Sequence, residues 1–270
     1  ACFVVRDAMW SGATRAFADA AVLLAARGYE TCFVAPAASE TERGLAVAGH
    51  DVIGMRSGGG WLRAGWRLRG VVASRLSEVL FVHDDREHLT AAAAVRFAGR
   101  GAVVRRTPSG ERLTLGRDGR LAMRLAATGF VFAHADDARG MAPPRGALAA
   151  HVAPPGVSIV TLRPPVAAGT IGGADAQRLV LIVGADRRRE ALNALRALSL
   201  LAPRHPGLRV TAFWPAADID TVRMEAAALG VAHRMAWRAT GAPRADVLAE
   251  ADLAWVIATA DDAVFAMLDA

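Results

Sequence analysis

Short apolar runs alternate along the chain with alanine-rich stretches in which apolar residues recur every three or four positions. The runs are rich in Val, Ile and Phe, which favour buried strands, whereas the longer stretches have the spacing of amphipathic helices. In the first half we expect strands at 2–5, 31–35, 51–55, 79–83, 102–105 and 130–133. The alternation predicts an α/β protein made of parallel βαβ units.

The clearest predicted helix covers 14–27. Phe17, Ala21 and Leu24 fall on one face at helical spacing, and Gly28 follows at a place where helices commonly end on a glycine. Gly49 and Gly101 precede the third and fifth predicted strands in the same way. We therefore expect a helix to end before each of these strands.

The same rhythm restarts in the second half. We expect strands at 178–184, 208–214, 231–237 and 252–258, with helices at 187–202 and 219–229. The Pro/Gly-rich stretch at 153–175 has the composition of a connection between lobes. We predict two Rossmann-like lobes with parallel sheets, at 1–163 and 178–270, joined by a linker at 164–177. The second lobe is expected to be incomplete at its C-terminus.

Length and charge narrow the function classes. The chain has 270 residues, enough for two lobes, and a formal net charge of +6. Its strongly basic side chains are all arginines, and they are scattered along the sequence. A basic surface attracts phosphates, anionic membranes and nucleic acid. Because no basic patch with interleaved aromatic residues is present, we expect no nucleic-acid partner.

Cysteine usage and hydropathy favour a cytoplasmic protein. Cys2 and Cys32 stand in neighbouring predicted strands without a CxxC pair, so we expect reduced core thiols. We find no secretory leader and no apolar run of the ~18 residues that spanning a bilayer requires. The expected location is cytoplasmic, with peripheral contact at the inner face of the membrane as an option.

The segment WSGATR, at 10–15, follows the first strand and opens the first helix. Gly12 lets the backbone approach a ligand closely, and the unpaired N–H groups of a helix N-terminus bind anions or sugar hydroxyls. The alternative is an ordinary βα turn in which Ser11 caps the helix.

The segment VHDD, at 82–85, lies at the carboxyl end of the fourth strand, the edge at which open α/β sheets bind ligands. His83 is therefore a candidate to contact substrate. The alternative is a hydrogen-bonded loop histidine. His83 and His88, with the neighbouring aspartates, match no established metal-ligand spacing, so we expect no metal.

A third candidate site opens the second lobe. Gly184 ends its first strand, and Arg187, Arg188 and Arg189 open the following helix. Guanidinium groups bind phosphate oxygens in a bidentate manner, so this segment predicts a diphosphate site. The alternative is a solvated basic turn.

Two further stretches carry candidate residues. Asp261 and Asp269 are eight positions apart, within about 80° of one another on a helix, so that one carboxylate could hold a ribose. The alternative is that Asp261 only favours the first turn of a helix. The basic, Trp-bearing stretch 61–76 could rest on a membrane or bind an anionic acceptor. The expected case is a lobe helix whose aromatic face packs inward.

Taken in order, these segments resemble the retaining family-four glycosyltransferases of the GT-B fold. The sequence lacks the signature motifs of serine hydrolases, P-loop NTPases and zinc proteases. The resemblance covers nearly the whole chain. It is carried by WSGATR before FADAAVLLAARGYETCFVAP, by VLFVHDD, by PPGVSIVTLRPP, by LVLIVGADRRREALNALRALSLLAPRHPGLRVTAFWP and by VLAEADLAWVIATADDAVFAMLDA.

The resemblance implies an enzyme that moves a sugar, with retention, from a nucleotide-diphosphate-sugar donor to a saccharide, lipid-linked or small-molecule acceptor. It implies a role in cell-envelope polysaccharide or glycolipid synthesis, with no metal or other cofactor. The second lobe binds the donor and the first lobe binds the acceptor.

The resemblance also implies roles for single residues. Gly12 would lie under the diphosphate and the transferred sugar, and His83 would hydrogen-bond that sugar. Arg187–Arg189 would neutralise the leaving diphosphate. Asp261 would face the sugar, and Asp269 would bind the ribose.

The chain departs from the family pattern at several positions. Ala13 replaces the second glycine of a Gly-Gly turn, Asp261 and Asp269 replace a pair of glutamates, and Glu190 stands where a phosphate-binding lysine is usual. These departures motivate an alternative function: a degenerate, non-catalytic paralogue that binds a nucleotide or a protein partner.

Overall fold

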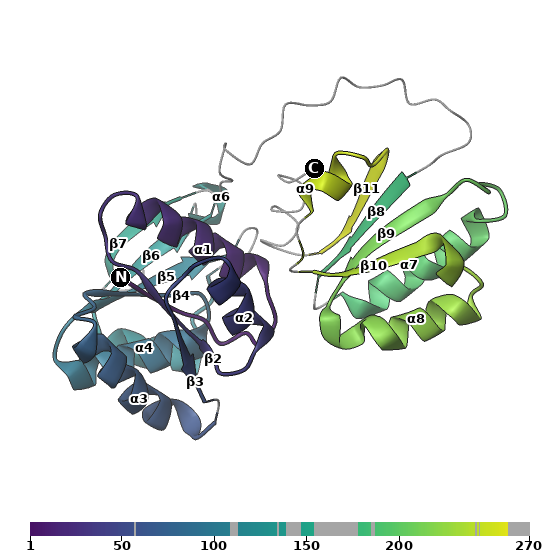
Figure 1. Cartoon of the computed structure of the whole chain (residues 1–270). Helices are drawn as coiled ribbons and strands as arrows, with labels where there is room; N and C mark the ends of the chain where they lie inside the picture. The colour runs from purple at the N-terminus through teal and green to yellow at the C-terminus, as the bar shows by residue number, and fades with distance from the viewer. Residues whose placement is uncertain are drawn as a thin grey trace. The chain divides into compact units, whose positions relative to one another are not determined.

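The chain is an α/β protein that divides into two compact units, Ala1–Gly156 and Val157–Ala270. The computed structural model describes residues 1–56, 58–108, 113–133, 135–138, 147–153, 178–184, 187–240, 242 and 244–258. The predicted linker at 164–177 lies outside the described residues. Figure 1 shows the helices and strands of each unit.

The first unit is built on a parallel sheet with the order β3-β2-β1-β4-β5-β6-β7. Its strands are β1 (Cys2–Val4), β2 (Cys32–Pro36), β3 (Val52–Met55), β4 (Val79–Val82), β5 (Ala102–Thr107), β6 (Thr128–Phe132) and β7 (Ala147–Val152). The strand order reverses direction between β1 and β4. In sheets of this kind, ligands bind at the carboxyl ends of the strands beside such a reversal.

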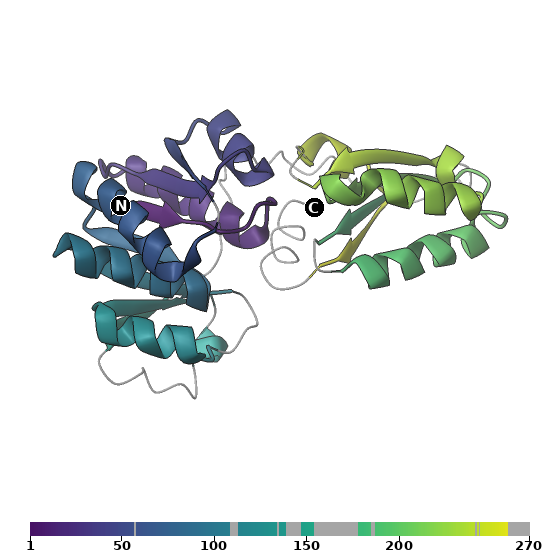
Figure 2. The same cartoon turned by 90° about the horizontal axis from the view of Figure 1, so that it is seen from below.

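Helices cover both faces of this sheet (Figures 1 and 2). They are α1 (Gly12–Ala25), α2 (Glu40–Val47), α3 (Gly60–Ser74), α4 (Asp85–Ala98), α5 (Arg117–Leu125) and the short α6 (Ala135–Ala138). One core lies between the sheet and α1 and α2, and another lies between the sheet and α3, α4 and α5.

The alternation of side chains along the strands explains this three-layer arrangement. Cys2 and Val4 belong to the core under α3 and α4, whereas Phe3 and Val5 belong to the core under α1 and α2. Successive residues of a strand point to opposite faces, so a continuous apolar run fills both cores. Phe3 stacks on Phe33 with ring centroids 5.0 Å apart.

The second unit has a smaller parallel sheet with the order β10-β9-β8-β11. Its elements are β8 (Arg178–Val183), α7 (Arg188–Leu201), β9 (Arg209–Trp214), α8 (Ile219–Ala228), β10 (Met235–Ala239), α9 (Ala245–Leu248) and β11 (Leu253–Ile257). α7 and α8 pack on one face of the sheet and α9 on the other (Figure 1). The order again reverses, here between β8 and β11.

The structure confirms the predicted fold class of two Rossmann-like lobes with parallel sheets. Cys2 and Cys32 are register partners in adjacent strands, and both thiols are buried and free. Two details differ from the prediction. The strand expected at 231–237 begins only at Met235, because Ala232–Arg234 forms a 3-10 turn. The edge strand β7, which is mostly exposed and rich in alanine, was not predicted.

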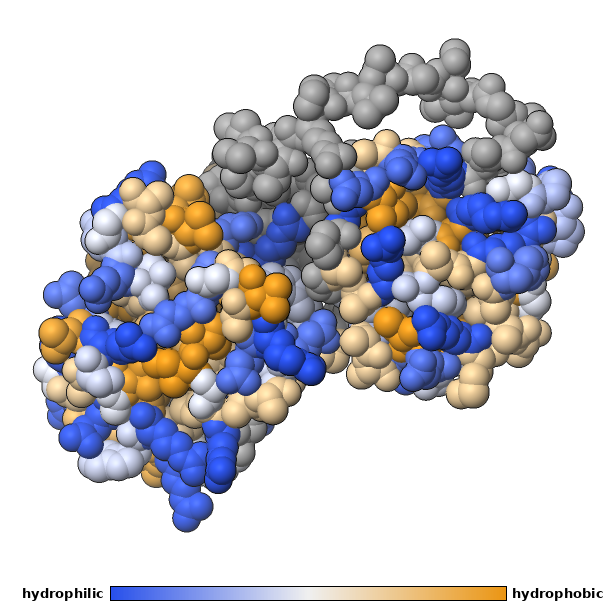
Figure 3. Space-filling view, viewed as in Figure 1, coloured by the Kyte–Doolittle hydropathy of each residue, from blue (hydrophilic) through white to orange (hydrophobic). Residues whose placement is uncertain are grey.

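Hydrophilic side chains are spread over the visible face of each unit and do not gather in one patch (Figure 3). Among the helices that the structure describes, none is long and apolar enough to cross a membrane.

Candidate functional site

The reversal of strand order in the first unit brings two sequence segments to one edge of the sheet. β1 and β4 are parallel neighbours, so their carboxyl ends lie together. The residues that follow them are Arg6 and Asp7 after β1, and His83 and Asp84 after β4. This edge is the candidate site of the first unit.

The turn before α1 has the predicted form. Ser11 is the N-cap, and its Oγ accepts a hydrogen bond from the Thr14 N–H at 3.2 Å. The Ser11 hydroxyl also donates to Asp7 Oδ2 at 3.3 Å. Gly12 is the first residue of the helix and is buried. The capping interpretation of Ser11 is therefore correct, and Gly12 stands at the positive end of the α1 dipole.

His83 lies between two carboxylates. Its Nδ1 is 3.0 Å from Glu87 Oε2, and its Nε2 is 3.5 Å from Asp7 Oδ2. The Nδ1 contact is within ion-pair distance, but its geometry does not meet that of a hydrogen bond. The imidazole also meets the Phe17 ring edge-on, at 5.6 Å between centroids. His83 thus has a fixed orientation at the carboxyl end of β4.

Glu87 organises the whole edge. Its side chain is 0% exposed, and its Oε1 accepts the backbone N–H of Arg6 at 2.7 Å. Its Oε2 accepts the backbone N–H of His83 at 2.9 Å and, more weakly, that of Asp84 at 3.4 Å. Asp84 in turn caps α4 by accepting the Glu87 N–H, which completes a capping box. One buried carboxylate therefore ties the β1 loop to the β4 loop.

The charges in this cluster perturb one another. Burial alone would lower the pKa of His83, but the nearby Glu87 charge, together with the contacts to Asp7 and Glu87, raises this pKa well above its usual value. The contact with His83 lowers the pKa of Asp7. Both shifts favour an imidazolium beside the Asp7 carboxylate. Asp7 is the outer partner, with 46% of its side chain exposed.

The remaining residues of the VHDD segment and its helix point elsewhere. Asp85 forms an ion pair with the buried Arg105 and accepts the N–H of Gly116. His88 is fully buried, and its Nε2 lies 3.0 Å from the Thr128 hydroxyl of β6. Within the described part of the chain, no cluster of three or more potential ligands could hold a metal ion.

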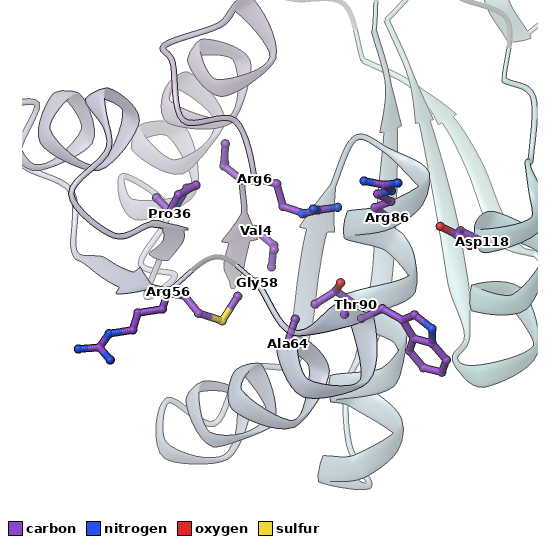
Figure 4. Close-up of a pocket in the computed structure, with 14 residues that line it drawn as sticks. Val4, Arg6, Pro36, Arg56, Gly58, Ala64, Arg86, Thr90 and Asp118 are labelled. Atoms are coloured by element: carbon purple, nitrogen blue, oxygen red, sulfur yellow. The ribbon is translucent and has the colours of Figure 1, made fainter.

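A pocket of about 450 Å³ lies beside the His83 cluster, at the carboxyl ends of β1, β2 and β3 (Figure 4). α3 and α4 supply its other walls. We call it the arginine pocket. Its lining includes Arg6, Arg56, Trp61, Arg86, Thr90 and Asp118. The pocket and the candidate site share one frame, because the Arg6 N–H is bound to Glu87 and Arg86 precedes Glu87 in the chain.

The Trp-bearing stretch forms α3, and its aromatic residues divide between two environments. Leu68 and Val72 are buried, and Trp61 packs against the same core. Trp66, in contrast, is 59% exposed and lies edge-on to Phe97, with the Arg69 guanidinium 4.5 Å from its ring centroid. The expectation of an inward aromatic face is correct for Trp61 and wrong for Trp66. Beside Trp61, the side of α3 that turns inward carries the aliphatic residues Leu68 and Val72.

The three arginines of the second unit stand at the start of α7, but carboxylates engage two of them. Arg187 is the N-cap and pairs with Glu190 at 3.0 Å. Arg188 pairs with Asp218 at 3.3 Å. Arg189 is exposed and makes no ion pair among the described residues. The pKa of Glu190 is lowered by a hydrogen bond from its own backbone N–H and by Arg187.

The predicted residues Asp261 and Asp269 lie outside the described residues. The sequence analysis also missed four site residues: Arg6, Asp7, Arg86 and Glu87. A signal for them exists, because Arg6 and Asp7 directly follow the first strand, and Glu87 stands at the third position of the capping box that Asp84 opens.

No protein-family model matches the chain, and no curated protein matches it by sequence. Solved structures do match it. Anabaena HepE, in complex with UDP-glucose, is 15% identical with a TM-score of 0.62, and the match covers 94% of this chain and 72% of HepE. The spinosyn rhamnosyltransferase SpnG, complexed with thymidine diphosphate, is 16% identical with a TM-score of 0.54, covering 98% of this chain and 77% of SpnG.

A third match is to a protein of a different class. A Listeria monocytogenes protein assigned as a UDP-N-acetylglucosamine 2-epimerase is 14% identical with a TM-score of 0.57, covering 94% of this chain and 73% of that protein. At these identities the similarity is one of fold. The chain therefore shares with these structures the GT-B type of fold, with two Rossmann-like lobes and parallel sheets.

Proposed function

We propose that the chain is a glycosyltransferase that moves a sugar from a nucleotide-diphosphate-sugar donor to an acceptor, with retention of configuration. The observation that carries the proposal is the His83 cluster. It places a histidine between two acidic side chains at the carboxyl edge of β4, beside the strand reversal of a fold shared with HepE and SpnG. Titratable groups with perturbed pKa values cluster at functional sites, and this one lies at the edge where such sheets bind ligands.

In this proposal, His83 and Gly12 contact the transferred sugar. The 3.5 Å contact between His83 Nε2 and Asp7 is too long for a strong hydrogen bond, so a sugar hydroxyl can take the proton that Nε2 offers. Asp7 then acts as a positioning residue for His83. The carboxyl-edge location of Gly12 lets the α1 N-terminus approach the same sugar.

The second unit is assigned to the nucleotide. Arg187, Arg188 and Arg189 are proposed to neutralise the diphosphate as it leaves, the charge that grows most in the transition state. Arg189 is the most available of the three for the diphosphate. Its neighbours Arg187 and Arg188 already form ion pairs, with Glu190 and Asp218 respectively. The roles of Asp261 at the sugar and Asp269 at the ribose belong to the same proposal.

A donor panel tests the assignment. The chain is incubated with UDP-, TDP- and GDP-sugars and mixed saccharide and glycolipid acceptors, and product formation, nucleotide release and anomeric configuration are measured. His83→Ala is expected to lower kcat about a hundredfold or more. The matched control is His151→Ala on the exposed edge strand β7, which should leave kcat unchanged. Epimerisation of the donor without transfer would overturn the proposal.

A second candidate function is that of a non-catalytic nucleotide-binding or partner-binding protein. The ion pairs of Arg187 with Glu190 and of Arg188 with Asp218 favour it, since both arginines are partly neutralised at the predicted diphosphate site. Calorimetry with UDP and TDP separates the two functions. Nucleotide binding without turnover of any donor in the panel supports the second function, whereas turnover rejects it.

We also propose peripheral membrane contact through the outer side of α3. Leu62 and Trp66 are exposed there, next to Arg63 and Arg67, and apolar side chains among cations are typical of surfaces that rest on anionic lipid. Co-sedimentation with phosphatidylglycerol vesicles tests this contact. Trp66→Ala should lower the bound fraction, and equal sedimentation with neutral phosphatidylcholine vesicles would argue against it.

A further inference from the structure

The arginine pocket carries an inference that deepens the proposed function and rests on it. We propose that this pocket binds a phosphate group of the acceptor, through the guanidinium groups of Arg6 and Arg86 and the hydroxyl of Thr90. The acceptor is thereby narrowed from any saccharide or lipid to one that carries a phosphate near the hydroxyl to be glycosylated.

The first observation is the balance of charge around the pocket. Arg6, Arg56 and Arg86 come from three different elements and line one cavity, and Asp118 is the single acid among its described lining residues. None of the three guanidinium groups forms a hydrogen bond or an ion pair among the residues that the structure describes. Arg6 also feels the nearby carboxylates of Asp7 and Asp84. An anion bound in the pocket would still lower the repulsion among its cations.

The directions of the side chains select two of the three arginines. In Figure 4, Arg6 and Arg86 lie toward the same side of the pocket, whereas the Arg56 side chain points away from both. Arg6 extends from the β1 loop, and Arg86 extends from the first turn of α4. Two guanidinium groups from separate elements can bind different oxygens of one tetrahedral anion.

A buried hydroxyl adds a third contact. Thr90 lies one turn after Arg86 on α4 and is only 3% exposed, yet its side chain lines the pocket. Its hydroxyl makes no hydrogen bond among the described residues, and Figure 4 shows its oxygen directed toward the side on which Arg6 and Arg86 lie. This hydroxyl is therefore available to a ligand oxygen that enters the cavity.

The N-terminus of α3 borders the same cavity. Gly58, Gly59 and Gly60 all have positive φ angles, and Gly58 and Gly60 line the pocket. The helix has no side-chain cap and no acidic residue in its first turn, so its first N–H groups stay available and its dipole is not offset. This feature adds to the arginines and Thr90 and favours an anion over a neutral sugar.

The size and position of the pocket indicate an acceptor and not a free ion. About 450 Å³ lies within the range of small-molecule sites and exceeds the needs of one inorganic phosphate. The backbone of Arg6 is bonded to Glu87, which also holds His83. A phosphate bound by Arg6 therefore brings the remainder of the acceptor toward the His83 cluster, where the transferred sugar is proposed to bind.

Calorimetry with the full chain tests the inference in the absence of any donor. The probes are glucose 6-phosphate, glucose and inorganic phosphate, together with dihexanoyl phosphatidic acid below its micelle concentration as a lipid source of the same group. We expect glucose 6-phosphate or the short lipid to bind, and glucose to bind at least tenfold more weakly. The phosphate ester that binds with the higher affinity shows whether the acceptor phosphate belongs to a sugar or to a lipid.

Matched variants locate the binding. Arg6→Gln and Arg86→Gln should each weaken phosphate-ester binding about tenfold, and Thr90→Val should weaken it several-fold. The control is Arg96→Gln, which removes an exposed arginine of the same helix away from the pocket and should leave the affinity unchanged. Circular dichroism confirms that each variant is folded.

Two outcomes overturn the inference: equal affinity for glucose and its phosphate ester, or the same loss of affinity in Arg96→Gln as in Arg86→Gln. Failure of the proposed function gives a different result. If no nucleotide sugar is bound or turned over, yet phosphate esters bind and Arg86→Gln removes that binding, the pocket stands as a phosphate site and the transferase assignment falls.

Discussion

Nδ1 of His83 lies 3.0 Å from Oε2 of Glu87, a carboxylate that is entirely shielded from solvent. The two residues are four positions apart in the sequence, but only Glu87 belongs to a helix. His83 directly follows β4, and Glu87 occupies the third position of α4. The same carboxylate accepts the N–H of Arg6 from the β1 loop. Glu87 therefore fixes the orientation of a candidate substrate-binding histidine and the connection between two loops.

Replacing Glu87 by glutamine should destabilise the first unit. The amide keeps the size of the side chain but removes the charge that pairs with His83, and its NH2 group replaces an acceptor of backbone N–H groups. We expect a loss of about 2–4 kcal/mol in the free energy of unfolding, the range for breaking a buried ion pair. Hydrogen–deuterium exchange of β1 and β4 peptides in a urea series measures this loss.

The matched control for that variant is Glu78→Gln. Glu78 is exposed, and its change should stay within about 0.5 kcal/mol. Equal shifts of the two variants would contradict the central role assigned to Glu87.

The raised pKa of His83 predicts a loss of stability on the alkaline side. The folded state holds the His83 proton more tightly than the unfolded state, so the contribution is fully present below the unfolded pKa of about 6.5. It decreases as the pH rises through the folded pKa. An NMR titration of the imidazole should show His83 still protonated above pH 7, and Asp7→Asn should lower its pKa. A midpoint below 6.5 would contradict the ion-pair geometry.

His88 predicts the opposite behaviour in acid. Burial, together with repulsion from Arg105, lowers its pKa from 6.5 to about 4. Below pH 6.5, His88 binds a proton in the unfolded state but not in the folded state. The free energy of unfolding therefore decreases by about 3 kcal/mol toward pH 4. His88→Gln should flatten this part of the pH dependence of unfolding. An unchanged acid slope would show that other groups cause it.

Two glycines of α3 should respond in opposite directions to the same substitution. A Cβ added at Gly65 would lie 2.7 Å from the Cβ of Ala93 on α4, whereas Gly70 has no other group within 4 Å. Gly65→Ala should cost about 1–3 kcal/mol by separating α3 from α4. Gly70→Ala should instead stabilise by up to about 1 kcal/mol through helix propensity. Thermal unfolding of both variants checks the sign, and two destabilised proteins would contradict the close helix contact.

The sequence pattern predicted the strands well because both faces of each sheet are covered. The residues of β1 fill two cores, so the whole strand appears as one apolar run. β7 lacks this signal, because it is an exposed edge strand composed largely of alanine. Local patterns therefore detect the buried part of the fold, and edge strands depend on pairing that the sequence does not display.

The candidate site was predictable only in part. His83 and Gly12 were found because they follow strands whose ends meet at the sheet edge. Glu87 and Arg86 looked like ordinary acids and bases of an amphipathic helix, and only the three-dimensional structure joins them to Arg6. The pairing of Arg188 with Asp218 is equally invisible in the sequence, since 30 positions separate them.

The last prediction concerns nucleotide affinity in the second unit. Glu190 competes with a diphosphate for Arg187, and the pair is exposed, so that breaking it costs little. Glu190→Gln should therefore tighten UDP or TDP binding about two- to fivefold. Arg189→Gln should weaken it about tenfold, because Arg189 is the guanidinium without an ion pair among the described residues at the start of α7.

Calorimetry at two salt concentrations measures these affinities, with Arg204→Gln as the control for a general loss of positive charge. Electrostatic attraction between Arg189 and the diphosphate should make the loss in Arg189→Gln smaller at high salt, because ions screen an exposed contact. If Glu190→Gln weakens binding, or if Arg204→Gln has the same effect as Arg189→Gln, the start of α7 does not hold the diphosphate. The nucleotide would then have to be sought elsewhere on the second unit.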